Sequence, residues 1–247
     1  MKPVKLNLEN SNDYFTREAF KVLRTNIQFC GVDTKVISFT SCEPNEGKTY
    51  ICVELARAMS EAGLKVLLID TDMRKSVMAS RYSDEKGIIG LSQYLSGMAE
   101  RDDIIYTAAN VGYDLVFSGI FPPNPVKLLG SKRFKTFIEE ERSNYDYILI
   151  DTAPVGIVID GAVVASICDG AVIVISVGMV SYRFVQHVRQ QIEKSGCHVL
   201  GVVLNRAYKA DSTYSKKYYG KYKGYYYMSE PYQKKAKKYQ AAANDNK

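Results

Sequence analysis

The sequence predicts a doubly wound α/β fold with a mostly parallel sheet, and two observations support this prediction. First, short apolar runs alternate along the chain with longer segments that have helical periodicity. Second, most of these runs are continuously apolar, as expected for strands that helices cover on both faces. Such alternation produces parallel sheets with right-handed crossovers, which bind ligands beyond the carboxyl ends of their strands.

Six apolar runs are predicted to be strands. In chain order they are Lys35–Ser41, Lys65–Asp70, Tyr113–Ser118, Tyr145–Asp151, Ala171–Val177 and His198–Asn205. Helices are predicted over Thr49–Ala62, Pro125–Arg142 and Ser181–Ser195, and an accessory helix over Asp13–Phe29 precedes the first strand. Gly63 and Gly196 follow two of these helices, and glycine is the residue that most often ends a helix.

The composition excludes several classes of protein. Of the 247 residues 46% are hydrophobic and 24% are charged, which is the ordinary globular balance. The five cysteines include no C-x-x-C pair and there are two histidines, so a disulfide framework or a zinc site is not expected. The sequence shows neither a secretory signal nor an apolar run of the roughly 20 residues that span a bilayer. We therefore expect a cytoplasmic protein.

The charge is unevenly distributed along the chain. Residues 206–247 hold 11 Lys and Arg against three acidic residues, a net charge of +8, whereas residues 1–205 have a net charge of −2. Ten of the 19 tyrosines also lie in residues 206–247. We expect three parts: an accessory helix region at 1–34, a main α/β domain at 35–205, and a mobile, basic, tyrosine-rich tail at 206–247.

The first predicted strand leads into the sequence SCEPNEGKT and then into a helix, which is the setting of a P-loop. Backbone N–H groups of such a loop and the helix N-terminus attract phosphates. Lys48 is expected to reach the β- and γ-phosphates, and the Thr49 hydroxyl to bind Mg²⁺. Cys42 replaces the first glycine of the usual pattern. The residues expected to bind the nucleotide are Pro44, Asn45, Glu46, Gly47, Lys48, Thr49 and Tyr50.

Carboxylates end two further predicted strands. One apolar run ends in Asp70 and Asp72, and another ends in Asp151. Oxygen ligands suit Mg²⁺, so Thr49, Asp72 and Asp151 are the expected metal residues. The two-residue spacing predicts that Asp70 and Asp72 point to the same side, and Asp70 is the expected base that accepts a proton from a substrate hydroxyl. Lys48 and the three aspartates form the expected catalytic set.

The order of these motifs resembles the bacterial tyrosine kinases (BY-kinases), which use Walker A, A′ and B motifs. The resemblance includes three aliphatic residues followed by D-x-D-x-R at 67–74, the PPNP segment at 122–125, and residues 18–26 of the accessory helix. It implies a P-loop NTPase fold of the BY-kinase/MinD-like type, ATP and Mg²⁺ as cofactors, and transfer of phosphate to tyrosine. Departures are Asn45, where Gly is usual, and Lys21, where Arg is preferred. Asparagine tolerates the left-handed backbone conformation, so we expect the loop to keep its geometry.

The alternative is a regulatory ATPase of the ParA/MinD type, a nucleotide-gated interaction switch. Those proteins carry a signature lysine at the start of the loop, and Glu43 stands there in this chain. An acidic side chain cannot neutralise a partner's phosphates, which disfavours the ParA-type dimer. By resemblance to related ATPases, Asn205 and Arg206 at the end of the last strand are candidates for contacting adenine.

Six tyrosines crowd into ten residues of the tail, interrupted by lysine and glycine. They are Tyr218, Tyr219, Tyr222, Tyr225, Tyr226 and Tyr227. A packed domain does not bury tyrosines in this way, because each hydroxyl needs a partner. Stacking on single-stranded nucleic acid and an inert solubilising tail are alternatives. The resemblance favours phospho-acceptor tyrosines, and we expect no nucleic acid partner.

Glu18, Lys21 and Arg24 lie along one side of the predicted accessory helix at spacings of three residues. A solvated helix face would also have this pattern. The resemblance implies a self-association surface instead, in which copies of the chain form a ring. It also implies a membrane-embedded activator of capsule or exopolysaccharide export, peripheral association with the inner face of the membrane through that activator, and cytosolic protein substrates.

Overall fold

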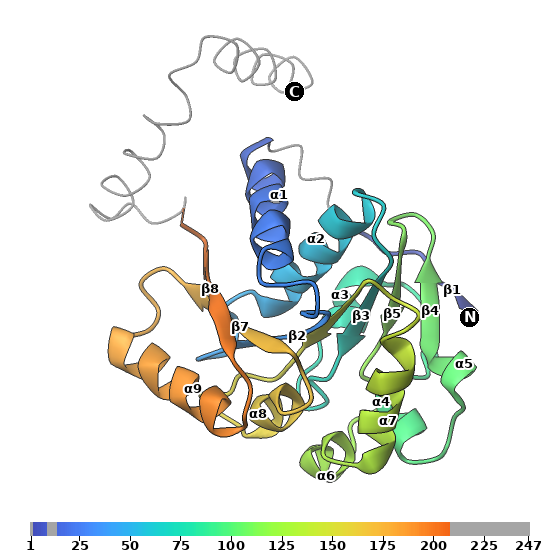
Figure 1. Cartoon of the computed structure of the whole chain (residues 1–247). Helices are drawn as coiled ribbons and strands as arrows, with labels where there is room; N and C mark the ends of the chain where they lie inside the picture. Colours follow the sequence, from blue (N-terminus) through green and yellow to red (C-terminus); the bar gives the residue numbers. More distant parts are fainter. Residues whose placement is uncertain (1, 9–13, 208–247) are drawn as a thin grey trace.

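The computed structural model describes residues 2–8 and 14–207, whose strands form one mostly parallel sheet (Figure 1). Across the sheet the eight strands of these residues are β1 (Lys2–Pro3), β4 (Ile105–Ala108), β5 (Tyr113–Val116), β3 (Val66–Asp70), β6 (Tyr147–Asp151), β2 (Val36–Ser41), β7 (Gly170–Ser176) and β8 (Val199–Asn205). Only the pair β4–β5 is antiparallel among them. The predicted fold class is confirmed.

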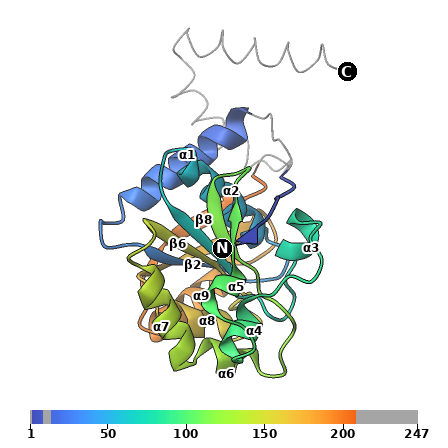
Figure 2. The same cartoon turned by 90° about the vertical axis from the view of Figure 1, so that its right-hand side faces the viewer.

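Helices cover both faces of this sheet. One face packs against α1 (Tyr14–Gln28), α2 (Lys48–Ser60) and α3 (Met78–Tyr82). The other face packs against α4 (Leu91–Leu95), α5 (Arg101–Ile104), α6 (Pro125–Leu129), α7 (Lys132–Glu141), α8 (Asp160–Ala165) and α9 (Tyr182–Lys194). Figure 1 shows α1 and α2 above the sheet and α6 to α9 below it, and Figure 2 shows the same layers from the side.

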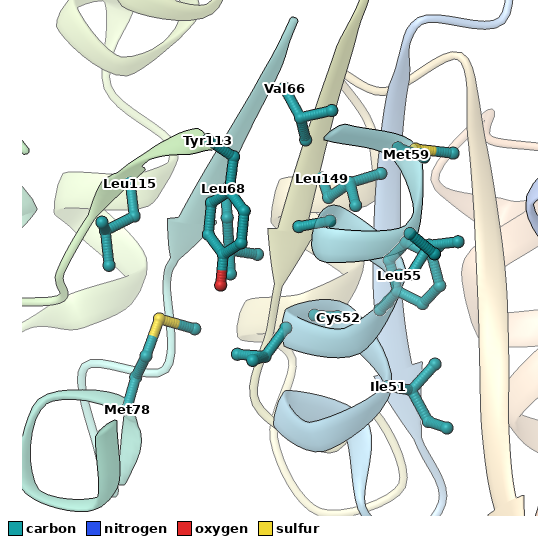
Figure 3. Close-up of a cluster of buried hydrophobic side chains, with 14 of the residues drawn as sticks. Ile51, Cys52, Leu55, Met59, Val66, Leu68, Met78, Tyr113, Leu115 and Leu149 are labelled. Carbon is teal, nitrogen blue, oxygen red and sulfur yellow. The ribbon is translucent and has the colours of Figure 1, made fainter. Parts of the chain in front are cut away.

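The apolar strands alternate between these two layers. In β3, Leu68 packs toward α2, whereas Leu67 and Ile69 pack into the cluster on the opposite face. Figure 3 shows the hydrophobic cluster that contains Leu68, in which Leu55 and Met59 of α2 lie over the sheet. Because both faces of each central strand are buried, its residues are apolar without a polar alternation.

Each predicted strand is present to within two residues at its ends, and the structure adds two strands to the six predicted. β4 is one, and β1 comes from the segment expected to be an accessory helix region and pairs with β4. The predicted helix Pro125–Arg142 is wrong as one element, because it divides at Gly130 and Ser131 into α6 and α7. The Ser131 hydroxyl accepts a hydrogen bond from the Phe134 N–H at 3.3 Å and starts α7 as a new helix.

Within the described residues, no helix is long and apolar enough to cross a membrane. The parallel strands β2, β3, β6, β7 and β8 all end at one edge of the sheet. The residues predicted to bind nucleotide and metal follow four of these strands, so the fold collects them at that edge.

Candidate active site

The loop between β2 and α2 has the backbone of an anion-binding site. Asn45 and Gly47 have positive φ angles of 65° and 92°, so Asn45 adopts the left-handed conformation expected of it. Gly47 precedes α2, and no side chain caps the helix there. The first N–H groups of α2 are therefore left for an anion. Burial raises the pKa of the Cys42 thiol to about 12, which keeps it uncharged in this loop.

Thr49 and Asp151 meet at the start of α2. The Thr49 hydroxyl donates a hydrogen bond to Asp151 Oδ2 at 2.5 Å, so α2 and the end of β6 are joined. Asp151 Oδ1 is buried and has no hydrogen-bond partner among the described residues. A buried carboxylate oxygen without a partner is costly, and a hydrated cation would satisfy it. Lys48 is also buried beside this group, and its charge lowers the pKa of Asp151 against the effect of burial.

Asp70 and Asp151 stand directly opposite each other at the ends of β3 and β6. Both are almost fully buried. Burial, followed by the charge of Asp151, raises the pKa of Asp70 to about 8. Burial also raises the pKa of Asp151, to about 6. Two neighbouring buried carboxylates resist ionising together, and a divalent cation would offset that cost.

Asp70 is held by the turn that follows it. Its Oδ1 accepts the Asp72 N–H at 3.0 Å, and its Oδ2 accepts a short hydrogen bond from the Ser76 hydroxyl. The side-chain alternation expected to align Asp70 with Asp72 does not apply, because β3 ends at Asp70. Asp72 is half-buried, and its Oδ1 accepts the N–H groups of Arg74 and Lys75 at 3.2 and 3.0 Å.

Arg74 has a partner that no sequence pattern predicted. Its guanidinium donates two hydrogen bonds to the buried carboxylate of Asp160 at the start of α8, at 2.7 and 3.0 Å. This pair fastens the turn after β3 to α8. No local sequence pattern indicates this ion pair, because Asp160 lies 86 residues from Arg74 in the chain.

The side chains of three residues predicted to bind nucleotide make contacts within the chain. The Glu46 carboxylate is fully buried and accepts the backbone N–H groups of Glu43 at 2.8 Å and Ser176 at 3.2 Å. The Tyr50 ring lies edge-on to Phe20 of α1, with centroids 5.9 Å apart. Asn205 Nδ2 donates to the Glu46 carbonyl oxygen at 2.9 Å. Only the backbone groups of Glu46 and Tyr50, and not these side chains, are therefore available to a nucleotide.

The remaining predicted residues lie in the loop, after β8 and on α1. Pro44 is exposed in the loop, and Arg206 is exposed after β8 with a positive φ of 58°. Lys21 pairs with Glu18 at 2.7 Å on α1, whereas Arg24 Nη1 donates to the Ala58 carbonyl oxygen of α2 at 2.9 Å. Part of the Arg24 guanidinium is therefore already hydrogen-bonded within the chain.

The six clustered tyrosines lie outside the described residues, as does all of the predicted tail beyond residue 207.

The donor set fits Mg²⁺ better than a transition metal. Among residues 2–8 and 14–207, no three His, Cys, Asp or Glu side chains converge into a metal cage. Mg²⁺ needs no such cage, because it keeps waters and is held by one or two carboxylates together with substrate phosphates. Thr49, Asp151 and Asp72 provide oxygen atoms beside the loop.

Comparison with known proteins supports this description. A family model described as an AAA domain matches residues 34–198. The chain is 42% identical over 207 residues to the tyrosine-protein kinase CpsD of Streptococcus agalactiae, covering 84% of this chain and 90% of that one. The solved kinase domain of the Escherichia coli tyrosine kinase ETK is 31% identical with a TM-score of 0.78, covering 83% of this chain and 80% of that chain.

Another solved structure shows how widely the fold is shared. The septum site-determining protein MinD from Pyrococcus horikoshii, complexed with Mg-ADP, has a TM-score of 0.61 and 23% identity, covering 74% of this chain and 76% of that chain. At this identity the likeness concerns the fold alone. The CpsD relative and the ETK kinase domain match at higher identity, over 90% and 80% of those chains. The chain therefore belongs to the bacterial tyrosine kinase (BY-kinase) family and is a protein-tyrosine kinase.

Proposed function

We propose that this kinase binds Mg-ATP in the loop between β2 and α2 and transfers the γ-phosphate to tyrosines of its own tail. The observation that supports this most is the buried carboxylate pair, Asp70 and Asp151, beside a loop with an anion-binding backbone. One carboxylate oxygen lacks a partner and one carboxyl group has a pKa near 8. A hydrated cation would satisfy the free oxygen, and its charge would favour ionised Asp70, which has to lose its proton before it can act as a base.

Each polar residue then has a distinct role. Lys48 stabilises negative charge on the β- and γ-phosphates, while Thr49, Asp72 and Asp151 hold the metal ion or its waters. Bound Mg²⁺ neutralises charge on the phosphates during transfer. Asp70 accepts the proton of the attacking tyrosine hydroxyl at a carboxylate oxygen, while Ser76 and the Asp72 N–H orient it. Catalysis is chiefly positioning and electrostatic stabilisation.

The acceptors in this proposal are Tyr218, Tyr219, Tyr222, Tyr225, Tyr226 and Tyr227, mainly on a neighbouring copy. The basic tail is attracted to the acidic site because its charge is opposite to that of the three aspartates. Asn205 and Arg206 at the end of β8 contact the adenine. Glu18, Lys21 and Arg24 of α1 contribute to self-association.

Residue 205 ends the catalytic part, and the tail follows it. By family resemblance, a membrane-embedded activator brings the kinase to the inner face of the membrane, where it regulates capsule or exopolysaccharide synthesis. Cytosolic proteins are further substrates.

The fate of labelled phosphate tests the proposal. With γ-labelled ATP and Mg²⁺, the proposed kinase retains label on tyrosine, whereas the alternative regulatory ATPase releases it as inorganic phosphate. Truncation before Ser212 is expected to remove most self-labelling and to spare ATP hydrolysis. Asp70→Asn is expected to lose self-labelling, and Asp103→Asn, at a surface carboxylate paired with Lys2, is its matched control. Label released only as phosphate would contradict the proposal.

Transfer between copies is tested by mixing two variants. Lys48→Met keeps the tail but cannot transfer phosphate, and the truncated chain keeps the site but has no acceptor cluster. Transfer in trans predicts label on the Lys48→Met chain in the mixture. A mixture without label, although the full-length chain labels itself, would show transfer within one copy.

A further inference from the structure

The phosphate loop contains a buried carboxylate that the proposed reaction does not use. Glu46 immediately precedes Gly47, and its side chain is fully buried. No Lys, Arg or His of residues 2–8 and 14–207 forms an ion pair with it. A buried carboxylate without a counter-ion is expensive unless hydrogen bonds satisfy it. It is retained here next to a site that has to attract anions.

Two backbone N–H groups satisfy this carboxylate. Oε2 accepts from Glu43, three residues earlier, and thereby closes the loop on itself. Oε1 accepts from Ser176 at the end of β7, 130 residues later, and thereby fixes the loop to the sheet. An ionised carboxylate is the side chain suited to this position, because both of its oxygens face N–H donors and it carries no proton of its own.

A second residue holds the same peptide from the other side. Asn205 Nδ2 donates to the Glu46 carbonyl oxygen at 2.9 Å, from the last residue of β8. The amide also stands close to Gly47, where an added Cβ would lie 2.1 Å from Nδ2. The side chain and the carbonyl of Glu46 are thus both fixed. The peptide between Glu46 and Gly47 cannot rotate without breaking one of these bonds.

We propose that Glu46 and Asn205 are positioning residues that keep the phosphate loop in its binding conformation before the nucleotide arrives. This inference rests on the proposed function, since it requires the loop to bind a triphosphate. With the carbonyl of Glu46 held by Asn205, the N–H groups of the left-handed turn at Asn45 and Gly47 stay directed toward the anion. Pre-organisation of this kind lowers the cost of binding.

Glu46→Gln separates this role from simple electrostatics, because the two predict opposite signs. Removal of a negative charge beside the loop would by itself tighten anion binding. The carboxamide, however, places an N–H group against one of the two backbone N–H donors, so one anchor is lost. We expect Glu46→Gln to weaken binding of Mg-ATP about 10- to 100-fold, the effect of one lost hydrogen bond to a charged acceptor.

Glu54→Gln is the matched control. Glu54 is a buried glutamate of α2 that pairs with Arg57 and makes no bond to the loop. Titration calorimetry of the full chain with Mg-ATP and with Mg-tripolyphosphate, which lacks a base, is run beside thermal unfolding without ligand. We expect Glu54→Gln to lower stability but to keep both affinities. Equal weakening by the two variants, or unchanged or tighter binding by Glu46→Gln, would overturn the inference.

Asn205→Ala provides a second, independent variant. If Asn205 positions the loop, Ala weakens binding of tripolyphosphate as well as ATP. If only ATP binding weakens, Asn205 contacts the base alone and its positioning role is wrong. Failure of the wild-type chain to bind either ligand would instead contradict the proposed function, so the two failures are distinguishable.

Discussion

Asp70→Asn is predicted to stabilise the nucleotide-free protein while abolishing phosphate transfer. The carboxyl group of Asp70 is buried opposite Asp151, and both burial and the charge of Asp151 raise its pKa to about 8. Asparagine has nearly the same shape and carries no charge. Its Oδ1 can still accept the Asp72 N–H, and its Nδ2 can donate to the Ser76 hydroxyl.

The magnitude follows from proton linkage. The Asp70 carboxyl stays protonated up to about pH 8 in the folded chain, whereas an unfolded aspartate loses its proton near pH 4. Between these values the folded state binds more protons, so the free energy of unfolding falls as pH rises. At about 1.4 kcal/mol per pH unit, reduced for coupling to Asp151, the loss between pH 5 and pH 8 is about 2–4 kcal/mol.

Thermal unfolding in EDTA, without nucleotide, measures this effect. At pH 8 we expect Asp70→Asn to melt about 5–10 °C above the wild type, since 1 kcal/mol corresponds to roughly 2–4 °C in a chain of this size. At pH 5 the difference shrinks, because the wild-type carboxyl is then protonated in the folded state. Asp103→Asn should show no such pH-dependent gain. An unchanged or lower melting temperature for Asp70→Asn at pH 8 would refute the reasoning.

Three further substitutions test the phosphate loop, the ion pair between Arg74 and Asp160, and the proposed self-association surface. Gly47→Ala should lower ATP affinity at least tenfold by calorimetry and cost about 1–2 kcal/mol of stability, because φ is 92° and the new Cβ would meet Asn205; near-normal binding would contradict this. Asp160→Asn, which weakens the bidentate pair with Arg74, should cost about 1.5–3 kcal/mol in urea unfolding, and no loss would show the pair to be unimportant. Arg24→Glu should shift sedimentation toward monomer, and an unchanged oligomer would count against the self-association surface.

Local patterns predicted much of the fold and part of the site. The buried parallel strands were readable because helices cover both faces, which leaves continuous apolar runs. The left-handed turn at Asn45 was readable because asparagine tolerates that conformation. The positions of Asp70 and Asp151 followed from the rule that parallel strands present their carboxyl ends at one edge.

The contacts that were missed join distant parts of the chain. Glu46 was expected to serve the nucleotide, but its partner Ser176 is 130 residues away, and no local pattern indicates that bond. The two-residue spacing of Asp70 and Asp72 suggested a shared strand face, but the chain turns directly after Asp70. Gly130 and Ser131 also divided a helix whose apolar periodicity looked continuous. In each case a turn or a tertiary hydrogen bond decided the structure, and the local sequence pattern did not indicate it.

The most direct test of the central claim is a single-turnover measurement of phosphotyrosine formed per bound ATP. Wild-type chain and Asp70→Asn are each loaded with labelled ATP, the Mg²⁺ is added, and tyrosine-bound label is quantified. We predict that both chains bind ATP, that the wild type transfers its label to tyrosine, and that the variant retains intact ATP. Transfer at the wild-type rate by Asp70→Asn, or no tyrosine label from nucleotide-loaded wild type, would contradict the account.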